Sequence, residues 1–155
     1  GMLSIKHRFE KRGIDMKKKK TYAAAVNWDH TGVKSTADMG GHLVTYDTGA
    51  EGEGPTPVAM LLSSLGACLT QTIASLASKQ RIEINDLQVI VEGDMDKEGM
   101  RNRSSGIRTG VQDIRYQVIM DSPAPAEQIE KLVELAEELC PVKDTLKAGA
   151  SVKKV

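Results

Sequence analysis

The sequence predicts an α+β protein in which antiparallel sheet covers helices, and three patterns lead to this prediction. Short stretches of alternating residues, typical of half-buried strands, occupy residues 21–48. A segment without a single charged residue follows, from 54 to 78. Two longer alternating stretches and an amphipathic helix pair complete the chain. The predicted order is three strands, a helix, two strands, a helix pair and a final strand.

The composition is that of a globular chain without net charge. The 155 residues are 40% hydrophobic and 27% charged, and Lys plus Arg balances Asp plus Glu at 21 each. No global field therefore favours nucleic acid as a partner. Residues 2–20 are basic and lack the apolar run of a secretory signal. We therefore expect a cytoplasmic protein.

Residues 1–20 are predicted to form a basic N-terminal arm that is partly flexible, and residues 21–155 a single domain. The arm ends in a run of lysines at 17–20, whose like charges repel one another. Nucleic-acid binding through this run is the less favoured alternative.

An antiparallel meander is predicted in the first half of the chain, before the uncharged segment. In its first strand Tyr22, Ala24, Val26 and Trp28 alternate with small or polar residues. The predicted strands are 21–29, 33–38 and 42–47, with turns at 30–32 and 40–41. A flexible acidic loop, 49–54, follows.

A long helix is predicted from Pro57 to about residue 79. Thr56 is a good N-cap, and Pro57 takes the first helical position, where a missing N–H costs nothing. One face is apolar at helical spacing: Val58, Leu62, Leu65, Leu69, Ile73 and Leu76. A second stripe is small and polar: Ser64, Cys68, Gln71, Thr72 and Ser75.

The absence of charged residues from 54 to 78 raises the question of whether this segment spans a membrane. The serines, threonines and prolines of this segment make it too polar for lipid on all sides. A helix that is uncharged all round is then expected to be buried inside protein. We expect no membrane partner.

Two strands are predicted at 82–94 and 111–121, paired across a charged connection at 95–110. A Pro-containing segment, 122–125, then begins a helix. Its core stripe is Ile129, Leu132, Val133, Ala136 and Leu139, and its expected solvent face is Glu127, Glu130, Lys131, Glu134 and Glu137. A second helix begins at Cys140-Pro141 and reaches about residue 147, and a last strand is expected at 151–155.

The only two cysteines, Cys68 and Cys140, give the sharpest indication of function, since they can form a redox pair. Cys140 is expected at a helix N-cap, where its sulfur can accept from free backbone N–H groups. Cys68 lies too deep in its helix to gain from the dipole. Cys140 is therefore, on local grounds, the more easily ionised thiol. Each cysteine can also be a simple core residue. Without a nearby pair of histidines we predict no metal site.

Two segments resemble the motifs of the OsmC/Ohr family, the osmotically inducible protein C and organic hydroperoxide resistance group. The first comprises 54–57 with 61–69, which reads Leu-Leu-Ser-Ser-Leu-Gly-Ala-Cys-Leu. The second is 136–146, where Cys-Pro-Val is followed by Thr-Leu. The order of elements also matches, so the resemblance covers roughly residues 21–155.

The resemblance implies an OsmC-like fold, an intertwined homodimer in which antiparallel sheets wrap around long central helices. It implies reduction of organic hydroperoxides in oxidative stress defence, with Cys68 as the peroxidatic thiol and Cys140 as the resolving thiol. Cys68 would become a sulfenic acid and condense with Cys140 to a disulfide. An external dithiol would reduce that disulfide, and no cofactor is expected.

Two departures place the chain in the broader OsmC-like branch. Hydroperoxidase members carry an Arg on an early strand and a Glu near the start of the central helix. Here residues 21–29 contain no Arg, and Val58 or Ala59 stands where Glu is expected. The candidates to activate Cys68 instead are His42, Glu51, Glu53 and Lys143. The alternative function is a non-catalytic dimeric module that binds a small hydrophobic ligand or senses redox state.

Overall fold

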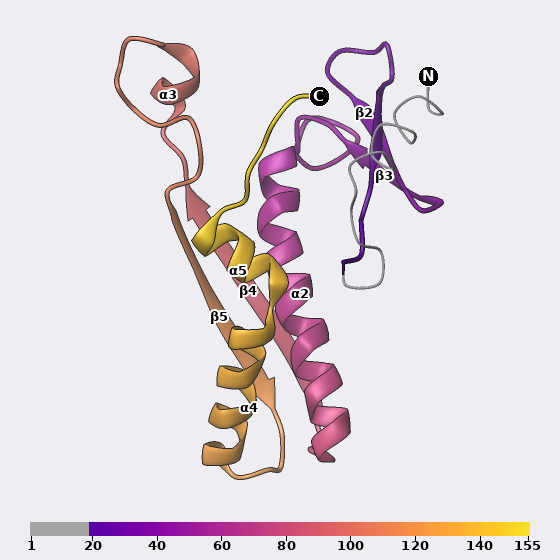
Figure 1. Cartoon of the computed structure of the whole chain (residues 1–155), viewed down its shortest axis with the longest axis vertical. Helices are drawn as coiled ribbons and strands as arrows, with labels where there is room; N and C mark the ends of the chain where they lie inside the picture. Colours follow the sequence, from indigo (N-terminus) through magenta and orange to yellow (C-terminus); the bar gives the residue numbers. More distant parts are fainter. Residues whose placement is uncertain (1–18) are drawn as a thin grey trace. The chain divides into compact units, whose positions relative to one another are not determined.

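The computed structural model describes residues 19–155 (Figure 1). The predicted basic arm at 1–20 therefore lies outside the described residues, except for Lys19 and Lys20. The chain forms two compact units, which are described separately: the first ends at Pro55 and the second is Thr56–Val155. Mixed helices and antiparallel sheets confirm the predicted α+β class.

The first unit contains the predicted three-stranded antiparallel meander. Its strands are β1 Ala25–Trp28, β2 Ser35–Met39 and β3 His42–Tyr46, in that order across the sheet. Pairing of β1 with β2 begins at Ala25↔Asp38. β1 is shorter than predicted because β2 turns away at Gly40 and Gly41, both at positive φ, so residues 21–24 have no strand to pair with.

The loop after β3 is closed by hydrogen bonds within the same unit. The Asp47 N–H donates to the Pro55 carbonyl, and the Gly49 N–H donates to the Gly54 carbonyl, both at 2.9 Å. The Asp47 carboxylate accepts from the Glu53 N–H at 2.9 Å. The loop predicted to be flexible is therefore hydrogen-bonded at both its ends.

The second unit begins with α2, Pro57–Gln80, as predicted. The Thr56 side chain accepts from the Ala59 N–H at 3.1 Å. The helix ends at Arg81, which has a left-handed φ of 56°. The Ile82 N–H then donates to the Ala77 carbonyl at 2.8 Å, which closes the helix end. Residues 82–85 complete this connection, and the following strand starts later than the sequence predicted.

Two long strands form the sheet of the second unit. β4 Asp86–Asp94 pairs antiparallel with β5 Asp113–Asp121, and Val91 lies opposite Tyr116. Their connection contains a short helix that the sequence did not indicate, α3 Lys97–Arg101. α4 Ala126–Leu139 and α5 Pro141–Ala148 follow as predicted. The predicted strand at 151–155 is wrong: these residues are exposed and have no strand partner in the described chain.

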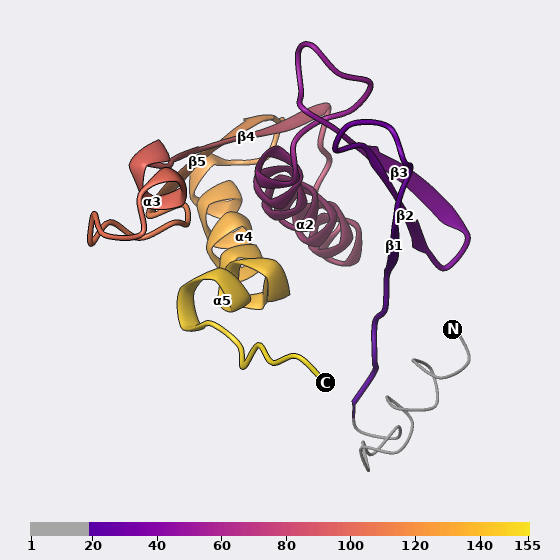
Figure 2. The same cartoon turned by 90° about the horizontal axis from the view of Figure 1, so that it is seen from above.

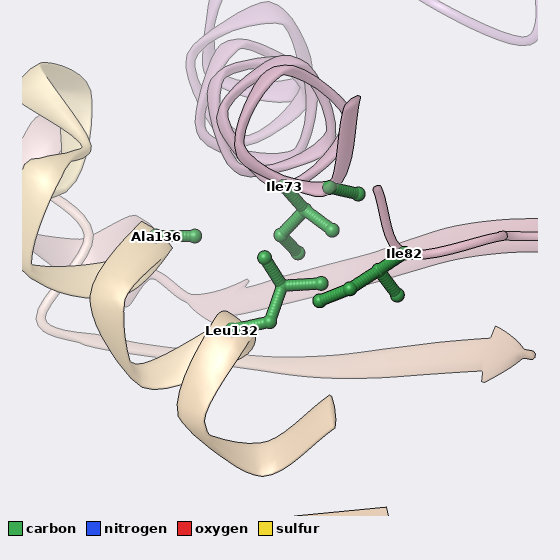
Figure 3. Packing of buried hydrophobic residues seen from close by; sticks show 5 residues of the cluster. Ile73, Ile82, Leu132 and Ala136 are labelled. Atoms are coloured by element: carbon green, nitrogen blue, oxygen red, sulfur yellow. The ribbon is translucent and has the colours of Figure 1, made fainter. Parts of the chain in front are cut away.

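α2, α4 and α5 lie on one face of the β4–β5 hairpin (Figure 2). One buried cluster joins α2 to α4 (Figure 3): Ile73, Ala77, Ile82, Leu132 and Ala136. A second cluster lies nearer the start of α2 and contains Leu65, Leu69 and Cys140. Gly66 allows α2 to lie close to β4, since a Cβ at this position would lie 3.3 Å from the Val91 side chain.

The prediction that α2 is buried all round is wrong for the single chain. Leu65, Leu69, Ile73 and Ala77 are buried, but residues on another face are exposed: Ser64, Ala67, Gln71, Ala74 and Ser75. By length and composition α2 could also cross a membrane, a criterion that core helices of soluble proteins meet as well.

Candidate active site

Cys68 lies in the middle of α2 and is half-buried. Its side chain packs against the cluster of Leu65, Leu69 and Cys140. The Thr72 hydroxyl donates to the Cys68 carbonyl at 2.7 Å, so this threonine bonds along its own helix. Cys68, a member of the predicted small polar stripe, therefore lies at the edge of the core.

Cys140 occupies the junction between α4 and α5, and its side chain is only 1% exposed. Its backbone is extended, and Pro141 begins α5 directly after it. The Cys140 Sγ accepts from the Lys143 N–H at 3.4 Å. The predicted thiol N-cap is therefore confirmed.

The fold brings the two cysteines to the same cluster. Cys68 packs on the buried cluster that contains Cys140. Burial, followed by hydrogen bonding with Cys68, raises the pKa of the Cys140 thiol, against the opposing effect of the Lys143 and Val142 N–H groups. The N-cap position alone predicts a lowered pKa for the Cys140 thiol. It is outweighed because the apolar cluster disfavours a thiolate at Cys140.

A polar cluster beside Cys140 was not predicted as a functional feature. The Tyr116 hydroxyl donates to Glu137 Oε2, and Lys143 Nζ lies 3.9 Å from the same oxygen. Lys143 Nζ also lies 5.9 Å from the centre of the Tyr116 ring. We call Tyr116, Glu137 and Lys143 the tyrosine cluster.

The sequence placed Glu137 on the solvent face of α4, and this is wrong. Its side chain is 27% exposed, because it lies between α5 and the hairpin. Burial raises the pKa of Tyr116, and Glu137 and Cys140 add to that shift. Tyr116 therefore stays a neutral hydrogen-bond donor. Alternation along β5 and the three-residue spacing from Glu137 to Cys140 are the sequence signals that could have indicated this cluster.

Of the candidate activating residues, only Lys143 belongs to the same unit as the thiols. His42 is an exposed residue of β3, and Glu51 is exposed in the loop that follows. The Glu53 carboxylate accepts from Lys34 Nζ, which also lies 2.8 Å from Asp29. Glu53 is thereby engaged in a surface ion pair. Lys143 contributes its backbone N–H to Cys140, while its ammonium group faces Glu137.

The second unit contains two hollows, and neither is lined by a cysteine. The larger, about 880 Å³, lies at the 95–112 connection and contains neither cysteine. A smaller one, about 370 Å³, adjoins the tyrosine cluster and is lined by Glu134, Glu137, Glu138, Lys143, Asp144 and Lys147. Residues 19–155 hold no group of three or more His, Cys, Asp or Glu side chains suited to a metal. The thiol pair is therefore the part of this unit with distinctive chemistry.

The chain is similar to known proteins in sequence and in fold. A family model described as OsmC-like protein matches residues 50–154. The crystal structure of an OsmC-like protein from Mycoplasma pneumoniae is similar, with 26% identity and a TM-score of 0.73 over 83% of this chain and 89% of that one. An organic hydroperoxide resistance protein from Legionella pneumophila has the same fold, with 20% identity and a TM-score of 0.60 over 86% and 94% of the two chains. No curated protein matches the chain.

Proposed function

The chain belongs to the OsmC-like family, which includes organic hydroperoxide resistance proteins, and from this premise we propose that it is a thiol-dependent peroxidase. Its substrate would be a hydroperoxide, with Cys68 as the peroxidatic and Cys140 as the resolving thiol. The observation that carries the proposal is the packing of Cys68 against the buried cluster that contains Cys140. Two cysteines that share one cluster are positioned to form a disulfide.

The proposed cycle has three steps. The Cys68 thiolate attacks the peroxide O–O bond, an alcohol leaves after taking up a proton, and Cys68 becomes a sulfenic acid. The Cys140 thiol then displaces the sulfenic hydroxyl, which leaves as water with the thiol proton. An external dithiol supplies two electrons and two protons to restore both thiols. No cofactor is needed in this cycle.

The two thiols differ in a way that supports these roles. Cys68 is half-buried, whereas Cys140 is shielded from a peroxide by the apolar cluster. Because the pKa of Cys140 is raised, this thiol keeps its proton and can donate it to the Cys68 sulfur.

We also propose that the active form is a cytoplasmic homodimer. The exposed face of α2 carries no charged residue from Pro57 to Ser78, which is unusual for a surface in water. Small residues on that face, among them Ala67 and Ala74, allow a second helix to approach closely. A reducing compartment would keep both cysteines free between cycles.

The rival proposal, a dimeric module that binds a small hydrophobic ligand or senses redox state, is favoured by one observation. Among residues 19–155, no Lys, Arg or His side chain is hydrogen-bonded to the sulfur of Cys68, the proposed peroxidatic thiol. A peroxidatic thiolate is normally stabilised by such a cation. The rival predicts ligand binding that survives loss of either thiol.

Dithiol-dependent consumption of an organic hydroperoxide tests the proposal. We expect turnover by the wild-type protein, none by Cys68→Ser, and a single turnover by Cys140→Ser, which lacks the resolving thiol. Equal consumption by wild type and Cys68→Ser would end the peroxidase proposal.

A further inference from the structure

The unequal burial of the two sulfurs has a consequence for the reductive half of the cycle. We propose that an external thiol attacks the Cys68–Cys140 disulfide at Cys68, and that Cys140 leaves as a thiolate into the N-cap of α5. This inference rests on the proposed function and specifies which of the two sulfurs meets the reductant.

Access is the first argument. A thiolate must approach the attacked sulfur along the axis of the disulfide bond. The Cys140 side chain is 1% exposed and packs among Leu65, Leu69 and neighbours on α5 and the hairpin. Cys68 lies half-buried on α2. An external thiol therefore reaches Cys68 more readily, whereas attack at Cys140 requires the apolar cluster to open.

The leaving group is the second argument. Cys140 Sγ already accepts from the Lys143 N–H at 3.4 Å, and the Val142 N–H also favours its charged form. Free N–H groups at a helix start stabilise an anion. Within the described residues, no donor of this kind contacts the Cys68 sulfur other than the Cys140 thiol. The negative charge released by the attack is thus better placed on Cys140.

Burial opposes this charge, and the mixed disulfide removes part of the opposition. In the reduced pair, the hydrogen bond with Cys68 and its charge both raise the pKa of Cys140. Once Cys68 is bonded to the external thiol it carries neither a proton nor a charge. Only the apolar surroundings then oppose the Cys140 thiolate, and the two backbone N–H groups counter part of their effect.

Charge on the two approaches is the third argument. The hollow beside the tyrosine cluster adjoins Lys143, whose N–H caps Cys140, and four carboxylates and two lysines line it. A thiolate entering there is repelled. The cluster against which Cys68 packs, Leu65, Leu69 and Cys140, carries no carboxylate. A thiolate reductant at Cys68 meets no like charge from these residues.

The bonds formed and broken in this step balance, as do its electrons and protons. The external thiolate forms a bond to Cys68 Sγ as the Cys68–Cys140 bond breaks, and the bonding pair leaves on Cys140 Sγ. Cys140 takes a proton from the second thiol of the dithiol reductant. That second thiolate attacks the mixed disulfide and displaces the Cys68 thiolate, so the dithiol is oxidised by two electrons.

The test is to locate the mixed disulfide on the full chain. The disulfide is formed with diamide, so that peroxidase activity is not required, and is then exposed briefly to 2-mercaptoethanol. After quenching with N-ethylmaleimide, peptide mass spectrometry locates the adduct. We expect roughly tenfold more mercaptoethanol on Cys68 than on Cys140, because the thiol must reach the attacked sulfur.

Two further measurements sharpen the result. In Cys68→Ser, the remaining Cys140 should react with hydroxyethyl disulfide about tenfold more slowly than Cys68 does in Cys140→Ser. Glu138→Lys makes the acidic hollow less negative and should leave the rate of disulfide reduction by thioglycolate unchanged, since the thiol does not enter there.

The outcomes separate this inference from the proposed function. If diamide forms no Cys68–Cys140 disulfide, both fail. If the disulfide forms but the adduct lies mainly on Cys140 or equally on both, the inference alone is overturned. Faster reduction by thioglycolate in Glu138→Lys also overturns it, because it shows that the reductant uses the acidic hollow.

Discussion

At the scale of residues, the environment of each sulfur decides its chemistry more than its place in the sequence does. The N-cap position of Cys140 was predictable from Pro141, but the burial that outweighs it was not. That burial comes from Leu65 and Leu69 on another helix and from the hairpin. Glu137 was misplaced for the same reason, since Tyr116 and Lys143 reach it from other elements.

The tyrosine cluster contributes to stability. Tyr116→Phe removes the donor to the half-buried Glu137 carboxylate and should lower the free energy of unfolding by about 1–3 kcal/mol. Urea denaturation measures this change. Tyr46→Phe is the matched control, because the Tyr46 hydroxyl makes no side-chain hydrogen bond within residues 19–155 and its loss should be smaller. Equal losses would show that the Tyr116 hydrogen bond contributes nothing specific.

Cys140 should make the stability of the protein fall at alkaline pH. Its folded-state pKa lies above the ordinary value of 9.0, mainly through burial. The unfolded chain therefore loses this proton first, and stability that is complete below pH 9 declines as pH rises further. The decline is at most about 1.4 kcal/mol per pH unit for this one group.

The free energy of unfolding measured between pH 7 and pH 10 in reducing buffer tests this, with Cys140→Ser as the comparison. Cys68, Tyr116, Glu137 and Lys143 face the same thiol and remain in both proteins. The wild type should lose more stability than the variant over this range. Parallel curves would contradict the buried-thiol assignment.

At the scale of elements, local signals located the helices well and the strands less well. Thr56 and Pro57 marked the start of α2, and Cys140 with Pro141 marked the start of α5, because caps are local interactions. Strand limits depend on partners elsewhere. Residues 21–24 and 151–155 have suitable composition for strands, but no neighbouring strand in the described chain pairs with them.

The end of α2 offers a stabilising substitution. Arg81 has a left-handed φ of 56°, a conformation that glycine adopts without strain. Its side chain is exposed and has no ion pair within residues 19–155. Arg81→Gly should raise the thermal midpoint, with a gain of up to about 1 kcal/mol. Arg81→Ala is the control and should give no such gain, and a lower midpoint for Arg81→Gly would contradict the account.

At the scale of the whole molecule, the order of elements and two cysteine motifs were enough to predict the fold class and the family. They did not locate a group that activates Cys68. His42, Glu51 and Glu53 were plausible by residue type, but type does not fix position, and Glu53 is engaged by Lys34. The exposed uncharged face of α2 also shows that a helix predicted from its sequence to be buried need not be buried within one chain.

The proposed homodimer can be tested on that face. Ala67→Glu introduces a charge where two copies of α2 would meet, and like charges in contact weaken association. Sedimentation equilibrium should show dimer for the wild type and a shift to monomer for the variant. Gln128→Glu on the exposed side of α4 is the control and should remain dimeric. A monomeric wild type would contradict the dimer.

The most direct test of the central claim is the fate of both thiols after one equivalent of organic hydroperoxide. Intact-mass and peptide analysis should show the loss of two hydrogens and a link between the Cys68 and Cys140 peptides in the same chain. Cys140→Ser should instead retain a sulfenic acid on Cys68. If the wild type keeps two free thiols, or links them only between chains, the account of a two-cysteine site within one chain is contradicted.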